Sequence, residues 1–103
     1  MTVYVLISSI ALPGKWADAR KAAHDSIKYL AGNSAYVGKY EILQPVGGPN
    51  KQYFWLCRYE SMVDFERDFM LRRSNAGWAE LWKAVELSTD TDNITSQTYT
   101  VRE

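Results

Sequence analysis

The pattern of apolar and polar positions in the first half of the chain predicts a strand, a helix and a second strand. Residues 3–11 are rich in β-branched and aromatic side chains and end at a Leu-Pro-Gly sequence, which is typical of a strand followed by a turn. Apolar residues then recur at three- and four-residue spacing over residues 15–30, which predicts an amphipathic helix that stops near Gly32. Residues 36–46 return to a strand-like pattern.

The middle of the chain predicts a hairpin that leads into a second helix. Residues 47–50, Gly-Gly-Pro-Asn, give the strongest turn signal, and a strand-like run follows at residues 52–60. Ser61 is a typical helix N-cap. The helix after it has its acidic residues early and Arg72 and Arg73 late, which is the order that the helix dipole favours. We expect both arginines to lie at a solvated helix end.

The remaining elements complete the prediction of the fold. A Ser-Asn-Ala-Gly sequence at residues 74–77 interrupts the helix, a further helix continues to about Ser88, and residues 94–101 form a last strand. The order is β-α-β-β-α-α-β, with two β-α-β halves around a central hairpin. It predicts one ferredoxin-like α+β domain over residues 1–103, a four-stranded antiparallel sheet with its helices on one face.

Both faces of the predicted sheet are substantially apolar or aromatic, because Phe54 and Leu56 lie opposite the apolar set of Tyr53, Trp55, Cys57 and Tyr59, and the first strand is apolar on both sides in the same way. Helices can cover only one face, and the pattern leaves open which one. Something else must cover the other face, and a two-fold homodimer is the commonest solution. We expect the dimer interface at aromatic residues: Tyr53, Trp55, Tyr59 and Tyr4.

Composition limits the chemistry. Twelve Lys and Arg balance twelve Asp and Glu over 103 residues, so the formal net charge is zero and a nucleic-acid partner is disfavoured. An RNA-recognition module shares the element order and the aromatic third strand, but that strand lacks the glycine between its aromatics. The single Cys57 and the single His24 exclude disulfides, paired-cysteine zinc sites and His-x-x-x-His sites within one chain. We expect no metal.

The targeting signals of exported and membrane proteins are missing from the N-terminal sequence. It has no basic region and no small-residue cleavage site, and no apolar run approaches the roughly 20 residues that span a bilayer. We therefore expect a cytoplasmic protein without a membrane partner.

Three features together resemble the dimeric α+β barrel superfamily, and within it the small proteins that are antibiotic-biosynthesis-monooxygenase-like or NIPSNAP-like. The first strand runs into a Pro-Gly-Lys turn with a helix beginning at Trp16. The third strand ends in Tyr-Glu-Ser and leads directly into a helix carrying Phe65 and Phe69. Trp78 opens the next helix. The resemblance implies that two sheets face each other in a closed barrel at a dimer interface, with ligands between sheet and helices in each subunit.

The resemblance also implies a function. Such a protein would bind an aromatic or apolar small molecule, or oxidise it as a cofactor-independent monooxygenase; a non-catalytic ligand-binding or regulatory domain is the alternative. The haem-degrading branch uses an Asn on the first strand and a His after the third. This chain has Ser8 and Ser9 on that strand and no His in the later helices, so it departs from that branch. We expect no cofactor.

The candidate site residues follow from these positions. His24, at the border of the apolar face of the first helix, is the candidate general base, because its ordinary pKa is near 6.5. Arg58 shares a strand face with Phe54 and Leu56, and it would either pair with Glu41 across the hairpin or hold an anionic group. The candidate ligand-binding residues are Phe69, Trp78, Trp82 and Arg58.

Overall fold

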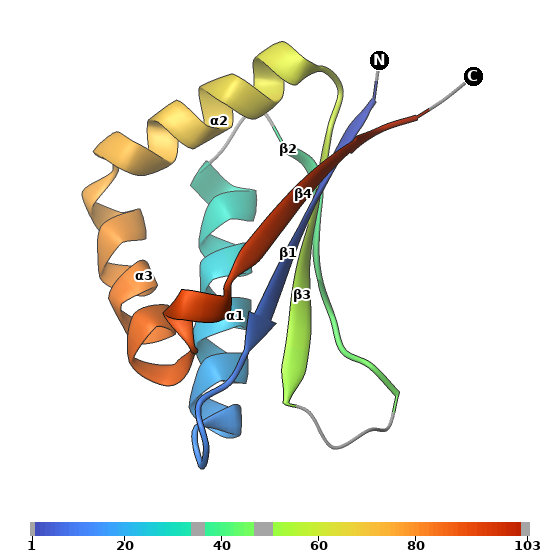
Figure 1. Cartoon of the computed structure of the whole chain (residues 1–103). Coiled ribbons are helices and arrows are strands. Elements are labelled where there is room, and N and C mark those ends of the chain that lie inside the picture. Colours follow the sequence, from blue (N-terminus) through green and yellow to red (C-terminus); the bar gives the residue numbers. More distant parts are fainter. Residues whose placement is uncertain (1, 34–36, 47–50, 102–103) are drawn as a thin grey trace.

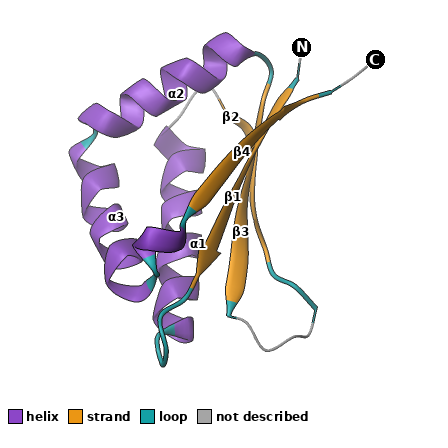
Figure 2. Cartoon of the chain, in the orientation of Figure 1, coloured by secondary structure: helices purple, strands orange, loops and turns teal. Residues whose placement is uncertain are grey.

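The computed structural model describes residues 2–33, 37–46 and 51–101. The predicted element order is confirmed, and the turn expected at residues 47–50 lies outside the described residues. The elements are β1 (Val3–Ile10), α1 (Trp16–Asn33), β2 (Val37–Leu43), β3 (Gln52–Tyr59), α2 (Met62–Ser74), α3 (Ala76–Ser88), a 3-10 turn (Thr91–Asn93) and β4 (Thr95–Thr100). The four strands form one antiparallel sheet in the order β2-β3-β1-β4. All three helices lie on one side of the sheet (Figures 1 and 2).

Side-chain caps fix where α2 and α3 begin. The Ser61 hydroxyl accepts a hydrogen bond from the backbone N–H of Asp64 at 3.2 Å, as its N-cap position predicts. Asn75 separates α2 from α3 because its backbone is extended, and its side-chain oxygen accepts a hydrogen bond from the N–H of Trp78 at 3.0 Å. The same oxygen accepts a hydrogen bond from the Tyr29 hydroxyl at 2.7 Å. Asn75 therefore ties the corner between α2 and α3 to α1.

The strand register decides which face of the sheet meets the helices. Cys57 pairs with Val5 and Trp55 with Ile7, and these residues all face the helices. Tyr53, Trp55 and Tyr59 are only 1%, 3% and 0% exposed in the single chain. The prediction that these three form a dimer interface is wrong, because the helices of the same chain already cover them. The aromatic surface that an RNA-binding module would need on β3 is buried for the same reason.

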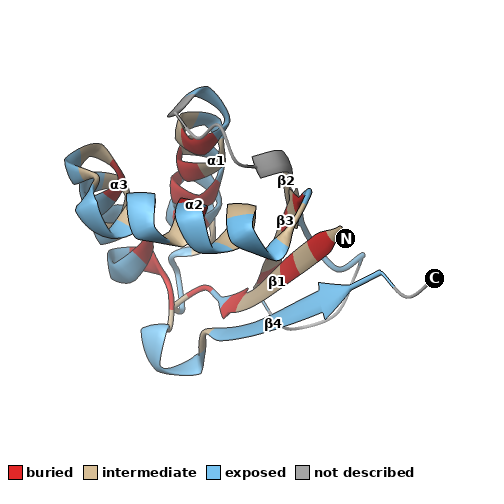
Figure 3. Ribbon diagram, turned by 90° about the horizontal axis from the view of Figure 1, so that it is seen from above, coloured by how far each residue is buried: buried red, intermediate tan, exposed pale blue. Residues whose placement is uncertain are grey.

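The opposite face of the sheet stays uncovered by the described part of the chain. Tyr4 lies on this face, on the other side of β1 from the buried Val3 and Val5. Besides Ile10 at the end of β1, the register places six apolar or aromatic residues here: Tyr4, Leu6, Leu43, Phe54, Leu56 and Tyr99. β4 is exposed along its whole length (Figure 3). We call these six residues the open-face patch.

Arg58 also lies on the open face, away from the helices. Its side chain forms an ion pair with Glu60 at 2.8 Å. The expected pairing with Glu41 is not the one that forms, because the register places Glu41 opposite Leu56.

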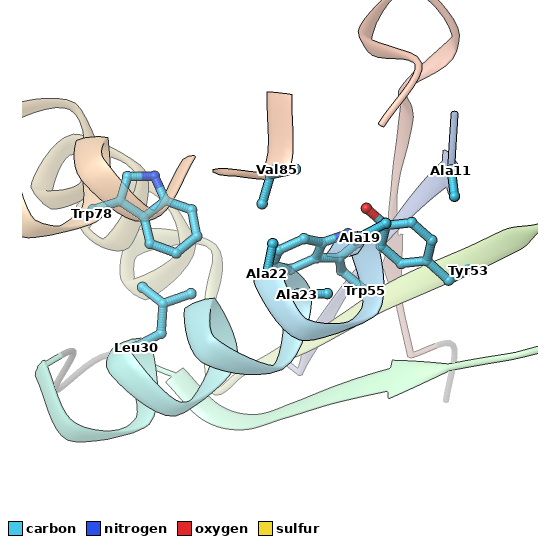
Figure 4. Packing of buried hydrophobic residues seen from close by; sticks show 9 residues of the cluster. All are labelled: Ala11, Ala19, Ala22, Ala23, Leu30, Tyr53, Trp55, Trp78 and Val85. Atoms are coloured by element: carbon cyan, nitrogen blue, oxygen red, sulfur yellow. The ribbon is translucent and has the colours of Figure 1, made fainter. Parts of the chain in front are cut away.

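The core lies between the sheet and the helices in two clusters. The larger cluster packs alanines and Leu30 of α1 against Trp78 and Val85 of α3 and against Tyr53 and Trp55 of β3 (Figure 4). The smaller one consists of Val3, Val5, Cys57 and Tyr59, with Phe65 of α2 against it. The small side chains of α1 allow that helix to approach the aromatic residues closely. α2 packs less extensively against the rest of the fold than α1 and α3 pack against each other, and a cavity lies beside it.

Candidate functional site

A cavity of about 420 Å³ lies between the sheet and the corner formed by α2 and α3. β1 and β3 provide one wall, and the two helices provide the others. Its lining residues are Ile7, Trp55, Phe69, Arg72, Arg73, Trp78, Ala79 and Trp82. This volume falls within the range of about 300–1,000 Å³ that is typical of small-molecule sites.

Three of the residues that line the cavity are tryptophans. Trp78 and Trp82 are one helical turn apart on α3, and their rings stack with centroids 6.0 Å apart and an interplanar angle of 26°. Trp55 of β3 meets Trp82 with centroids 6.3 Å apart. The indole nitrogen of Trp55 is buried and has no hydrogen-bond partner among the described residues. The wall can therefore pack against a flat apolar ring.

A buried ion pair stands at one end of the cavity. Arg72 donates a hydrogen bond from Nη2 to Oδ2 of Asp68 at 2.8 Å, and the two side chains are only 10% and 1% exposed. The same Asp68 oxygen accepts hydrogen bonds from the hydroxyls of Tyr59 at 2.5 Å and Tyr40 at 3.2 Å. Arg72 Nη2 also lies 3.1 Å from the Tyr59 hydroxyl. These contacts hold the Arg72 guanidinium in place at the end of the cavity.

Aromatic rings surround the same guanidinium. Its central carbon lies 5.1 Å from the ring centre of Trp78 and 5.2 Å from that of Phe69. A cation at this distance from a ring is attracted by the negative face of the π-system. Arg72 thus connects the polar network around Asp68 to the aromatic wall.

Burial also sets the protonation of this cluster. It raises the pKa of the Tyr59 hydroxyl far above its usual value, against the opposing effect of Arg72. It likewise raises the pKa of the Cys57 thiol. Burial alone would lower the pKa of Arg72, but Tyr59 and Asp68 outweigh it, so its pKa is higher than usual. Arg72 is therefore charged, while Tyr59 and Cys57 are neutral at ordinary pH.

The predicted ligand-binding residues are partly brought together. Phe69, Trp78 and Trp82 all line the cavity, whereas Arg58 lies on the other side of the sheet. His24 is exposed on α1 and is not among the lining residues. The structure therefore does not bring the candidate base to the cavity.

Sequence reasoning missed Arg72. It was expected at a solvated helix end, but only its neighbour Arg73 is exposed. A signal was available, since Asp68 stands four residues before Arg72, the spacing at which side chains meet on a helix. Trp55 was also misplaced, because it was assigned to the dimer interface and instead forms part of the cavity wall.

The lining offers binding groups and no acid–base group. Among the described residues that line the cavity there is no carboxylate, histidine or cysteine, and the two arginines can only donate hydrogen bonds. No group of three or more metal-binding side chains occurs in the described ranges. The arrangement can hold a flat apolar ring and stabilise negative charge at one end.

Comparison with solved structures identifies proteins of the same fold. SnoaB, a cofactor-independent oxygenase from Streptomyces nogalater, matches with a TM-score of 0.77 and 13% identity, over 99% of this chain and 94% of that one. A protein from Caulobacter crescentus CB15, named as a candidate antibiotic biosynthesis monooxygenase, matches with a TM-score of 0.79 and 15% identity, over 99% and 91%. The chain has the fold of these proteins. The resemblance expected from the sequence is confirmed at that level.

A third match has the same fold. A protein from Bacteroides fragilis NCTC 9343, described as dimeric, of unknown function and with a ferredoxin-like fold, matches with a TM-score of 0.74 and 10% identity, over 97% of this chain and 96% of that one. No protein-family model matches the sequence, and no curated protein is significantly similar to it. At these identities the structural matches establish the fold alone.

No helix within the described ranges is both long and apolar enough to cross a bilayer. The cytoplasmic location expected from the sequence stays a prediction.

Proposed function

We propose that the protein binds an aromatic or apolar small molecule in the cavity between its sheet and the α2–α3 corner. The observation that carries this proposal is the wall formed by Trp55, Trp78 and Trp82 around a space of about 420 Å³. Indole faces bury large apolar areas, and a flat ring stacked on them gains contacts that water cannot supply. A one- or two-ring ligand suits this volume.

We further propose oxidation of that ligand by dioxygen without a cofactor. The support is the fold shared with SnoaB, which is described as a cofactor-independent oxygenase. In such a reaction the substrate supplies the electrons: an activated CH2 group, such as that of the keto tautomer of a naphthol, becomes C=O, one oxygen atom of O2 enters the product and the other leaves as water. Because none of the described lining residues is a carboxylate, histidine or cysteine, a substrate that is itself acidic or electron-rich suits this cavity.

A cavity-filling substitution tests the binding site. Ala79 is exposed in the first turn of α3 and lines the cavity, so Ala79→Trp fills the entrance without replacing a core side chain. Ala84→Trp is the matched control, since Ala84 is also exposed on α3 but lies outside the cavity. Binding of 2-naphthamide is measured by isothermal titration calorimetry. We expect Ala79→Trp to abolish binding and Ala84→Trp to preserve it; equal binding by both variants would refute the site.

Oxygen consumption tests the reaction separately. A panel of dihydroxynaphthalenes is incubated with the protein in an oxygen-electrode chamber containing a metal chelator. We expect the unchanged chain to consume oxygen faster than the spontaneous rate. Ala79→Trp should abolish this additional consumption, and Ala84→Trp should retain it. Binding without such consumption would contradict the oxidation and favour the non-catalytic ligand-binding alternative.

We also propose that two copies of the chain pair through the open-face patch. The support is the uncovered apolar character of that face and the matching fold of a protein described as dimeric. Sheet faces that carry aromatic and aliphatic residues are stabilised when they are removed from water. The sheets would then meet through the face opposite to the one expected from the sequence.

Light scattering after size exclusion tests this pairing. We expect a mass near twice 11.8 kDa for the unchanged chain. Leu56→Glu places a charge at the centre of the patch and should give monomers, because burying an unpaired charge is costly. Thr98→Glu is the matched control, since Thr98 is exposed on β4 and the register places it opposite Val5, on the other side of the sheet. A monomeric unchanged chain would refute the pairing.

A further inference from the structure

The two adjacent arginines at the cavity have very different electrostatic environments. Arg72 is buried, and the carboxylate of Asp68 neutralises its charge at 2.8 Å. Arg73 is exposed and also lines the cavity. It forms no ion pair with any described residue. Of the two arginines, Arg73 is therefore the one whose charge no described carboxylate balances.

The local sequence explains why Arg73 has no ion-pair partner among the described residues. On a helix, side chains three and four residues apart are neighbours. For Arg73 the preceding neighbours are Phe69 and Met70, and the chain leaves α2 directly after it. Glu66 shares a shallow groove with Arg73 on the outer side of α2, but no ion pair joins them. No acidic side chain within its own helix competes for this guanidinium.

None of the other described residues that line the cavity carries a negative charge to balance Arg73. They are aromatic or aliphatic, apart from the already neutralised Arg72. The first turn of α3 contributes Trp78 and Ala79 to the lining, and the N-terminal end of a helix carries a partial positive charge. Counting Asp68 with the arginines, this end of the cavity has a net charge of one positive unit.

We propose that the ligand of this cavity is an aromatic anion, with its ring against the tryptophan wall and its acidic group, such as a carboxylate, on Arg73. This inference rests on the proposed binding function and adds the charge class of the ligand. The guanidinium fork of an arginine matches the two oxygens of a carboxylate. A neutral amide with the same aromatic ring gains the stacking contacts but not the ion pair with Arg73.

Two probes of the same shape separate the inference from the binding function. Isothermal titration calorimetry compares 2-naphthoate with 2-naphthamide on the unchanged chain, on Arg73→Gln and on Arg20→Gln. Arg20→Gln is the matched control, because Arg20 is exposed on α1, away from the cavity, and its loss changes the net charge equally. Both arginine variants keep the Asp68–Arg72 pair, so the fold should be retained.

We expect 2-naphthoate to bind about tenfold more tightly than 2-naphthamide, which is the scale of one accessible charge-assisted pair. Arg73→Gln should remove this preference without weakening 2-naphthamide, and Arg20→Gln should keep it. Added salt should weaken only the naphthoate. Equal affinities for the two probes, or a preference that survives Arg73→Gln, would overturn the anion inference and leave the binding function standing. Failure of both probes to bind would overturn both.

Discussion

Removal of the Asp68 carboxylate should destabilise the protein strongly. Asp68→Ala leaves the Arg72 guanidinium, only 10% exposed, without its counter-ion and leaves the hydroxyls of Tyr59 and Tyr40 without their acceptor. Breaking a buried ion pair on one side typically costs about 3–5 kcal/mol. A domain of this size has a total stability of about 5–15 kcal/mol. The substitution should therefore lower Tm by about 12–25 °C.

A double substitution tests the physical reason for this loss. Asp68→Ala with Arg72→Met removes both charges and leaves an unbranched apolar side chain in the place of Arg72. If the cost comes from the uncompensated buried cation, the double variant should recover a large part of the lost stability. Thermal unfolding followed by circular dichroism measures Tm for the single and double variants.

An exposed ion pair provides the control. Lys83 and Glu80 approach to 2.9 Å on α3, but their side chains are 67% and 74% exposed, so water screens them. Glu80→Ala should leave Tm unchanged within error. The reasoning would be refuted if Asp68→Ala unfolded no earlier than Glu80→Ala, or if Arg72→Met made the Asp68→Ala variant still less stable.

Two further predictions concern pH and backbone packing. Burial raises the pKa of Cys57 above its ordinary value of 9.0, so the folded chain holds a proton that the unfolded chain releases, and stability should fall as the pH rises above about 9. Cys57→Ala should therefore reduce the decrease of Tm with pH between pH 8 and 10. An equally steep decrease of Tm in this variant would contradict the prediction. Replacing glycine by alanine in a helix usually raises stability by up to about 1 kcal/mol. Gly77→Ala should not show this increase, because its Cβ would lie 2.9 Å from Cζ of Tyr29. Gly32→Ala, with open space around it, should show that gain in urea unfolding, and a stabilised Gly77→Ala variant would contradict the close approach.

The order of the elements was predictable because each boundary carries its own local chemistry. Ser61 caps α2 with its hydroxyl, and Asn75 both ends α2 and caps α3 with one side chain. Such signals depend on a few neighbouring residues and need no knowledge of the rest of the fold. The alternation along β3 was equally local, and it correctly separated Phe54 and Leu56 from the four residues on the other side.

The face that meets the helices was harder to predict, because both sets of β3 residues contain apolar side chains, although the charge of Arg58 already accompanies Phe54 and Leu56. The register of β2 adds a second charge to that set. Ile42 pairs with Trp55, whereas Glu41 pairs with Leu56, so a carboxylate accompanies the Leu56 face. A charged side chain is far costlier to bury than Ile42, which favours the Leu56 face as the one away from the core. The register depends on pairing across the hairpin, which a single strand does not reveal.

The contrast between Arg72 and Arg73 shows that the spacing of residues along a helix determines part of the site. Successive helix positions point about 100° apart, so adjacent arginines cannot share one environment. The residue four positions before Arg72 is Asp68, which lies against the sheet under α2, and the residue four positions before Arg73 is Phe69, at the cavity wall. An acid at that spacing draws Arg72 inward and cancels its charge, while Phe69 offers Arg73 no counter-ion. A shift of one position along α2 thus changes the residue four positions earlier from an acid to an aromatic. As a result Arg72 stabilises the fold, whereas Arg73 is available to a ligand.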